Sequence, residues 1–113
     1  MRIVHTADVH LSPDNPERLE ALHEVIDLCE EEDAELLLIT GDLFDSNVDI
    51  EELKTEIRPL FSDNSFQTLV IPGNHDKSAF RKEDYFGDDI EVLQDNPYSQ
   101  KIFDDVNIVA LPY

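Results

Sequence analysis

The stretch Gly41-Asp42-Leu43-Phe44-Asp45 decides the fold of this chain, because it follows directly on the apolar run Leu36-Leu37-Leu38-Ile39-Thr40. An apolar run of this length, with acidic residues before it and a glycine after it, predicts a buried strand of a parallel sheet. Gly41 allows the backbone to bend sharply where the strand ends. The strand therefore delivers a carboxylate, Asp42, into the loop at its carboxyl end.

Two other strand-like runs end in a similar loop. Residues 2–7 lead into Asp8-Val9-His10, and residues 66–71 lead into Pro72-Gly73-Asn74-His75-Asp76. The three loops are spaced by about the length of one βαβ unit, roughly 30 residues or more. Neighbouring parallel strands would bring the three loops to one edge of a sheet, where open α/β folds hold their functional sites.

The rest of the chain has the periodicity of short helices and strands. Asn15 followed by Pro16 is typical of an N-cap and the first position of a helix, and Asp49 can cap a second helix. The predicted elements are a helix over 16–32, a helix over 50–60, a helical turn over 77–82, and strands over 90–93 and 106–111, the last paired with 101–103. Together they predict one α/β domain with a mostly parallel sheet and flanking helices.

The composition is strongly acidic. Eight Lys and Arg stand against 27 Asp and Glu, so the formal net charge is −19. Such a chain repels nucleic acid and anionic membranes on net charge alone. Because the acids are spread over predicted helix faces and loops, the pattern favours adaptation to a high-salt cytoplasm over an acidic interaction arm. At 1 M salt the Debye length falls to about 3 Å, which screens the self-repulsion.

The single cysteine and the hydropathy pattern indicate the compartment. Cys29 alone cannot form an internal disulfide, which suits a reducing compartment. It lies in helical register with Leu19, Leu22 and Ile26, and this predicts a buried, unreactive thiol. No apolar stretch approaches the roughly 20 residues that span a bilayer, and no signal peptide precedes the first strand. We therefore expect a cytoplasmic protein without membrane contact.

Asp8, His10 and Asp42 have the chemistry of a metal site. Asp8 and His10 are alternate residues at a strand end, so their side chains can converge. A carboxylate with a neutral imidazole suits Mn²⁺, Fe or Zn²⁺ better than Mg²⁺ or Ca²⁺, and the Asp42 carboxylate can bridge two cations. The alternative is a solvated Asx turn at Asp8 and a cap or turn at Asp42. For Asp45, support of a neighbouring ligand and a turn role both stay open.

Gly73-Asn74-His75-Asp76 is the most specific stretch. Asn74 offers a neutral carbonyl ligand, and Gly73 permits a close backbone approach. His75 can donate to a phosphoryl oxygen, with Asp76 setting its tautomer. In isolation these four residues could form a plain turn. Their order behind the two acidic loops, at matched spacing, favours a functional site.

These three loops resemble the motifs of the calcineurin-like metallophosphoesterases, namely Asp-x-His, then Gly-Asp, then Gly-Asn-His-Asp/Glu, each after a strand. The resemblance covers residues 2–76. A narrower similarity to the SbcD-type DNA double-strand-break repair exonucleases rests on three stretches: Ile3-Val4-His5-Thr6-Ala7-Asp8-Val9-His10-Leu11, Gly41-Asp42-Leu43-Phe44-Asp45-Ser46 and Ala110-Leu111-Pro112-Tyr113.

The resemblance implies a fold, a reaction and roles for particular residues. The fold would be the first half of an αββα sandwich, and the reaction a two-metal hydrolysis of phosphodiesters with Mn²⁺ as the most suitable ion. The implied partners are DNA or another phosphodiester substrate and an ATPase subunit. The implied site residues are Asp8, His10 and Asp42 for one metal, Asp42 and Asn74 for the second, and His75 with Asp76 for catalysis.

The histidine count departs from the family pattern. The family completes its site with later histidines, including a Gly-His-x-His pair, whereas this chain has only His5, His10, His23 and His75. His5 and His23 fall inside a strand and a helix, which predicts structural roles. We therefore expect residues 1–113 to be the amino-terminal part of a metallophosphoesterase (nuclease) domain, binding about one ion with little or no activity.

One further expectation, on association, follows from this interpretation. An unpartnered strand near 106–111 would leave an apolar edge that favours a homo-oligomer. The alternative functions are a small-molecule phosphodiesterase or phosphatase, and a non-catalytic metal-binding or assembly module.

Overall fold

The strands and helices occur close to where the sequence predicts them. The computed structural model describes residues 1–46, 50–74, 76, 80, 85–103 and 106–111. Its elements in chain order are β1 (Ile3–Thr6), α1 (Pro16–Glu31), β2 (Leu36–Thr40), α2 (Ile50–Ile57), β3 (Gln67–Ile71), β4 (Ile90–Val92), β5 (Ser99–Phe103) and β6 (Val106–Ala110). Of the predicted turn over 77–82 only Phe80 is described, and the predicted cap Asp49 lies outside the described residues.

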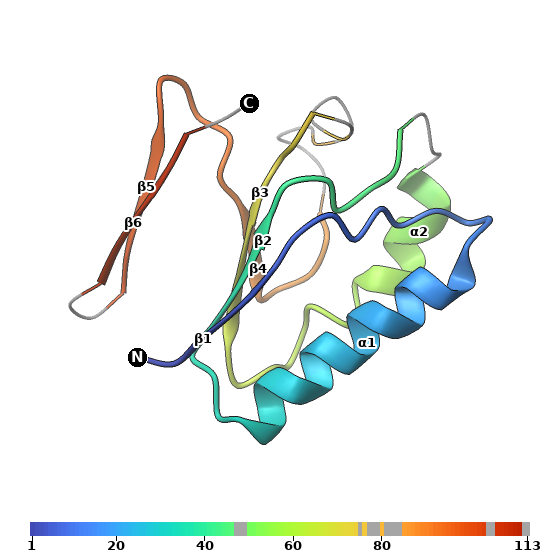
Figure 1. Ribbon diagram of the computed structural model, residues 1–113, viewed down its shortest axis with the longest axis horizontal. Helices are drawn as coiled ribbons and strands as arrows, with labels where there is room; N and C mark the ends of the chain where they lie inside the picture. Colours follow the sequence, from blue (N-terminus) through green and yellow to red (C-terminus); the bar gives the residue numbers. More distant parts are fainter. Residues whose placement is uncertain (47–49, 75, 77–79, 81–84, 104–105, 112–113) are drawn as a thin grey trace.

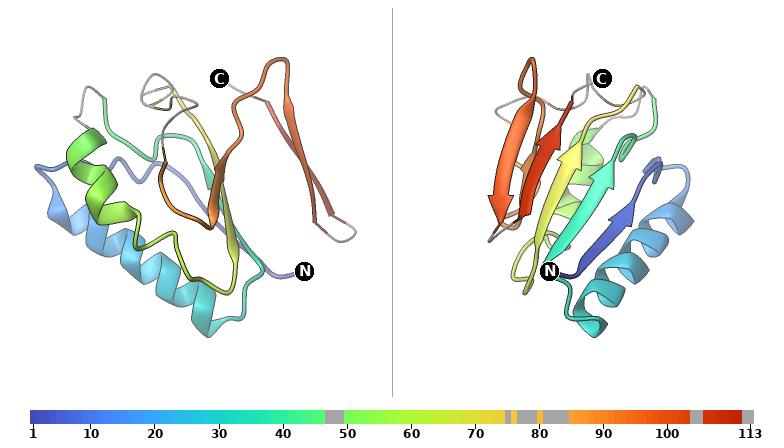
Figure 2. Two further views of the ribbon diagram at one scale, coloured as in Figure 1. Left: turned by 180° about the vertical axis from the view of Figure 1, so that it is seen from behind. Right: turned by 60° about the vertical axis from the view of Figure 1, so that its left-hand side comes forward.

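A four-stranded parallel sheet forms the centre of the domain. Its strand order is β1-β2-β3-β4, and each neighbouring pair is parallel. The two helices cover one face of this sheet, and the β5–β6 hairpin lies against the other (Figures 1 and 2). The predicted α/β fold with a mostly parallel sheet is confirmed. The pairing of 101–103 with 106–111 is confirmed as well, since β5 and β6 are antiparallel neighbours.

The main core lies between the sheet and the helices. Its central side chains come from α1 (Leu22, Ile26, Cys29), α2 (Ile50, Leu53, Ile57) and the helix-facing side of the strands (Leu37, Ile39, Val70). The apolar stripe predicted for the first helix is therefore confirmed. Cys29 is fully buried, and burial together with the neighbouring Glu30 carboxylate raises the pKa of its thiol. Its predicted lack of reactivity has this physical basis.

The helix ends differ from the prediction in two details. Asn15 precedes α1 and Pro16 is its first residue, but the Asn15 side chain makes no capping hydrogen bond. Its backbone carbonyl accepts the Arg18 N–H instead, at 3.1 Å. The second helix ends at Ile57 rather than near Leu60, because Pro59 disfavours a helical conformation in the residue before it.

A second, smaller core joins the sheet to the hairpin. Leu36, Leu69, Leu93 and Ala110 are buried there. The outward side of the hairpin leaves Ile102 65% and Val109 54% exposed, which gives the predicted association an apolar surface. Whether the chain associates there stays a prediction.

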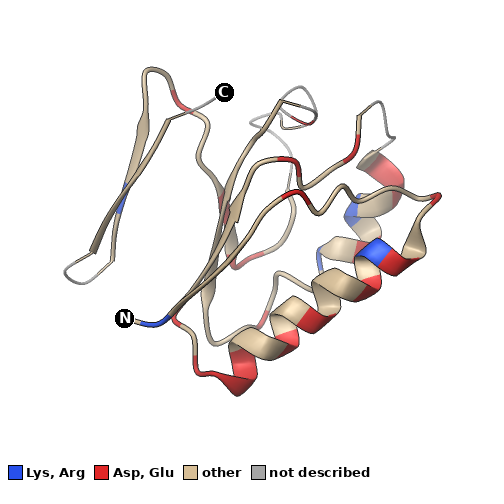
Figure 3. Ribbon diagram, in the orientation of Figure 1, with Lys and Arg blue, Asp and Glu red and all other residues tan. Residues whose placement is uncertain are grey.

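The acidic residues are distributed along α1 and the loops, while the described part of the hairpin carries few charges (Figure 3).

Neither of the two described helices combines the length and the apolar composition needed to cross a membrane.

Thr68 on β3 places an unsatisfied polar group in the core. Its side chain is fully buried, and its hydroxyl has no hydrogen-bond partner among the described residues. We expect Thr68→Val to raise the free energy of unfolding by about 1 kcal/mol, because it removes an unsatisfied buried polar group at constant shape. In thermal denaturation this corresponds to a rise in Tm of about 4 °C. Thr55→Val is the control, since the exposed Thr55 hydroxyl donates to the Glu52 carbonyl. An unchanged or lower Tm for Thr68→Val would contradict the prediction.

Candidate metal centre

Asp8, His10 and Asp42 come together at the carboxyl ends of β1 and β2. Their ligand atoms all lie within 4.8 Å of one another, and within the described residues this is the one group of three or more such side chains. His10 Nε2 lies 3.9 Å from Asp8 Oδ1 and 3.9 Å from Asp42 Oδ2. Asp42 is buried and Asp8 is exposed, so the cluster opens to solvent on the Asp8 side.

Backbone hydrogen bonds hold the two loops together beyond the strands. The Asp8 N–H donates to the Gly41 carbonyl at 3.0 Å, and the His10 N–H donates to the Asp42 carbonyl at 2.9 Å. One step further, Leu11 forms a parallel bridge with Phe44. The loops therefore continue the parallel pairing of β1 with β2, and this fixes the distance between the first and second acidic loops.

The three clustered residues share an unusual backbone conformation. Their φ angles are 56° for Asp8, 52° for His10 and 54° for Asp42, all in the left-handed region. This region costs a non-glycine residue about 1 kcal/mol, and residues held in it concentrate at functional sites. Gly41 has a φ of 93°, so the sharp bend predicted before Asp42 is confirmed.

Asp45 orients His10. The Asp45 Oδ1 atom lies 3.4 Å from His10 Nδ1. Because an ionised carboxylate can only accept, this bond requires the proton on Nδ1, and in the neutral imidazole the Nε2 lone pair then faces Asp8 and Asp42. The same carboxylate accepts the Ser46 N–H at 3.0 Å. These contacts favour support of the neighbouring candidate ligand His10, the first of the two roles that the sequence left open for Asp45.

The surroundings of Asp45 also favour its charged form. The Ser46 N–H, and after it the bond and charge of His10, hold the pKa of the Asp45 carboxyl below its ordinary value. The carboxylate therefore stays an acceptor for His10 at neutral pH.

Arg18 is a supporting residue that the sequence interpretation did not include. Its Nη1 atom donates to the His10 carbonyl at 2.8 Å and lies 3.4 Å from Asp45 Oδ2. Its position in the sequence could have indicated this role. Arg18 is a cation in the first turn of α1, where the helix dipole disfavours positive charge. A basic residue placed there, in a chain this acidic, indicates a specific local partner.

The third loop approaches Asp42 directly. A Cβ atom built on Gly73 would lie 2.5 Å from Asp42 Oδ1, so the close approach predicted for this glycine is confirmed. Asn74 is the next residue, an exposed turn position, and Asp76 is fully buried. His75 lies outside the described residues. The roles of Asn74, His75 and Asp76 stay predictions.

The other two described histidines lie outside the cluster. His5 bonds Thr40 Oγ1 at 2.6 Å, and His23 is an exposed residue of α1. His10 is therefore the only described histidine in the ligand group.

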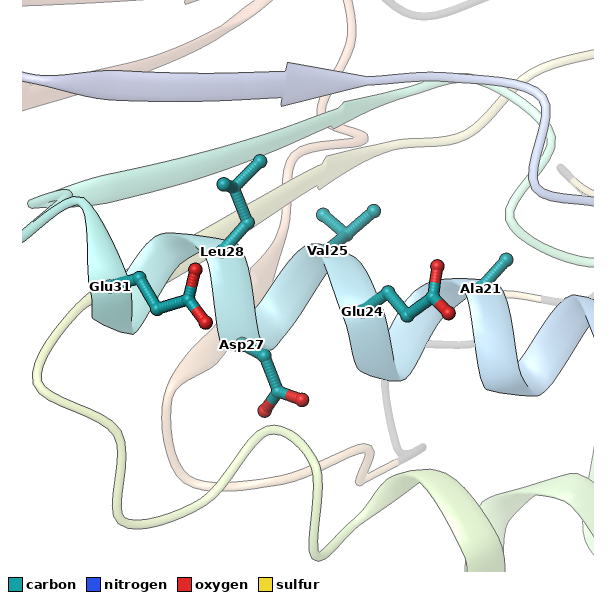
Figure 4. A pocket seen from close by; sticks show the side chains of 6 residues that line it. All are labelled: Ala21, Glu24, Val25, Asp27, Leu28 and Glu31. Atoms are coloured by element: carbon teal, nitrogen blue, oxygen red, sulfur yellow. The ribbon is translucent and has the colours of Figure 1, made fainter.

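An open groove runs along the outer side of α1. It has a volume of about 590 Å³ and is lined by Ala21, Glu24, Val25, Asp27, Leu28 and Glu31. In Figure 4 Leu28 and Val25 point to one side of the helix and Asp27 to the other. A smaller cavity of about 230 Å³ adjoins it and reaches Asp8. Among the described residues, the carboxylates that line the groove form no ligand group, so the candidate site is the cluster at the strand ends.

The donor set fits a divalent metal. Two carboxylates, one of them buried, and an imidazole whose Nε2 faces them match the ligands that such ions take from proteins. The fold and the cluster together define an α/β protein with a candidate metal centre at the edge of a parallel sheet. The family model of calcineurin-like phosphoesterases matches residues 1–112. The chain belongs to this family, which confirms the resemblance at that level.

The ligand assignment can be tested by removing Asp42. We expect Asp42→Ala to abolish measurable Mn²⁺ binding, because Asp42 supplies the buried carboxylate of the cluster. Isothermal titration calorimetry in molar KCl measures the affinity. Asp63→Ala is the matched control, since Asp63 is exposed and has a similar left-handed backbone (φ 59°) but lies outside the ligand group. Binding retained in Asp42→Ala, or lost equally in Asp63→Ala, would contradict the assignment.

Proposed function

We propose that this protein is a phosphodiesterase that works with Mn²⁺. The observation that carries the proposal is the cluster of Asp8, His10 and Asp42, with His10 Nε2 facing both carboxylates. Membership of the phosphoesterase family supports metal-dependent hydrolysis of phosphoesters. Mn²⁺ is the proposed ion because a mixed set of carboxylates and imidazole favours transition metals over Mg²⁺ or Ca²⁺.

The residues of the chain have distinct roles in this proposal. Asp8, His10 and Asp42 would hold one ion, and Asp42 and Asn74 the second. A bound ion supplies positive charge to a phosphoryl oxygen and lowers the pKa of water. His75 would donate a hydrogen bond to the phosphoryl group, which stabilises the charge that develops on it.

The ligand count sets the expected stoichiometry and rate. Of the residues assigned above, three would bind the first ion, whereas the shared Asp42 and the neutral amide of Asn74 would bind the second. We therefore propose about one bound Mn²⁺ per chain, held more weakly than in a complete two-metal site, and slow turnover, because a two-metal displacement needs both ions.

DNA is the proposed substrate, with an ATPase subunit as partner, as in the SbcD-type nucleases. The similarity of residues 3–11 and 41–46 to those nucleases supports this choice. The net charge of −19 supports a second candidate, a small phosphodiester, because the protein repels a polyanion at low salt. Salt near 1 M removes most of this repulsion, so the two candidates differ most at low salt.

Hydrolysis assays test the proposed activity. We expect Mn²⁺-dependent cleavage of bis(p-nitrophenyl) phosphate in molar KCl, slow and abolished by EDTA. His75→Ala should lower kcat by about 100-fold, in the range found when one hydrogen-bond donor to the developing charge is removed, with the Mn²⁺ affinity unchanged. Asp63→Ala should match the wild type. Cleavage that persists in EDTA, or that is equal in His75→Ala, would contradict the proposal, and parallel assays with labelled DNA separate the two substrates.

We propose that the acidity is an adaptation to high salt in the cytoplasm. The last turn of α1 contains no basic residue, and acidic residues follow the helix. These carboxylates therefore lie at the negative end of the helix dipole, where they are unfavourable. Arg2 offsets part of this charge by donating to the Glu32 carbonyl at 2.7 Å. The lone buried Cys29 supports a reducing compartment.

Thermal denaturation in KCl tests this part. We expect Tm to rise by many degrees between low and molar KCl, because salt screens the carboxylates. The double variant Glu31→Gln, Asp33→Asn should raise Tm at low salt and reduce its salt dependence. Asn suits the left-handed φ of 52° at position 33. As a control, Asp14→Asn before the start of α1 should not stabilise. A Tm independent of KCl would contradict the adaptation.

A further inference from the structure

The buried carboxylate of Asp76 joins two of the three loops. Its Oδ1 accepts the Gly73 N–H at 2.7 Å, and its Oδ2 accepts the Phe44 N–H at 3.1 Å. The side chain is fully buried. Hydrogen bonds from backbone amides to an ionised carboxylate are about twice as strong as those between neutral groups.

The two donors lie on either side of Asp42. Phe44 follows Asp42 by two residues, and its ring is fully buried against the rings of Phe80 and Phe86, at 5.3 and 5.8 Å between centroids. Gly73 lies against the Asp42 carboxylate, where an added Cβ would come within 2.5 Å of Oδ1. Asp76 therefore connects the loop that carries Asp42 to the backbone that this carboxylate touches.

We propose that Asp76 is a positioning residue for the metal centre, which holds Asp42 in its ligating position. This inference rests on the proposed function, since it takes Asp42 to be a metal ligand. In this proposal Asp76 supports the candidate metal ligand Asp42, whereas the sequence analysis predicted that it orients His75.

Both oxygens of the carboxylate are needed for this role. Asp42 has a left-handed φ of 54°, a conformation that persists only where the surroundings hold it. Asp76 anchors the loop after Asp42 at Phe44, and it holds Gly73 in the place that leaves room for the Asp42 side chain. Asn at position 76 would keep the size but present an NH₂ group to one of the two amide donors.

Asp76→Asn tests the proposal against Asp89→Asn. Asp89 is a matched control because its carboxylate likewise accepts a backbone N–H, that of Asn64, at 2.7 Å, and it belongs to no ligand group. We expect Asp76→Asn to weaken Mn²⁺ binding by about tenfold or more, in the range of residues that support metal ligands. Asp89→Asn should keep the wild-type affinity, even if both variants lose similar Tm. Calorimetry below the Tm of each variant measures this.

A measurement without metal tests the positioning role of Asp76 independently of any hydrolytic activity. Hydrogen exchange measured by NMR should show the Phe44 and Gly73 amides protected in the wild type and in Asp89→Asn, and exposed in Asp76→Asn. Asp76→Glu, which keeps both acceptor oxygens, should bind Mn²⁺ more tightly than Asp76→Asn. These measurements stand even if the protein hydrolyses no phosphodiester.

Several outcomes would overturn the proposal. The first is a wild-type Mn²⁺ affinity in Asp76→Asn. If kcat of this variant also falls as in His75→Ala, the result indicates that Asp76 orients His75 and does not position Asp42. Equal loss of affinity in Asp89→Asn is another. If Asp76→Asn does not fold in molar KCl, hydrogen exchange of the wild-type protein is the test. The proposal is overturned if the Phe44 and Gly73 amides exchange as fast as the amide of the exposed Asn74.

Discussion

The parallel pairing of β2 with both β1 and β3 is the constraint on which the rest of this structure depends. Because the three strands run in the same direction, their carboxyl ends meet at one edge of the sheet. The pairing continues into the loops, since Gly41 accepts the Asp8 N–H and donates its own N–H to the Ile71 carbonyl at 2.8 Å. Asp42 follows this central glycine and so lies between its two neighbouring loops.

The same arrangement concentrates strain and negative charge. Asp8 and Asp42 bring two carboxylates into one cluster, on backbone that is left-handed at both residues. Like charges at this separation repel one another, and in a chain of net charge −19 the repulsion is not confined to the cluster. A divalent ion held by the cluster would relieve this repulsion, and binding of such an ion would then stabilise the folded state.

Much of the fold could be predicted because it follows from local patterns. The apolar run before Gly41 and the α1 stripe have the periods of a buried strand and an amphipathic helix, and both are confirmed. The clustering of Asp8, His10 and Asp42 followed from the parallel order of the strands. Individual side-chain bonds were less predictable: Asn15 has the composition of an N-cap, yet its side chain makes no capping bond, because such a bond depends on local geometry and not on residue type alone.

The sequence by itself determined the positions of the strands along the chain, the loops that carry the candidate ligands and the family motifs, because each of these depends on residue type and spacing along the chain. Only the tertiary structure decided the spatial order β1-β2-β3-β4 and which groups support the candidate ligands. Asp45 orients His10 across 35 positions, and Asp76 reaches Phe44 across 32. The physical reason is that a hydrogen bond depends on a few tenths of an ångström and on direction. Those quantities are set only once the strands are packed, and no pattern along the chain encodes them.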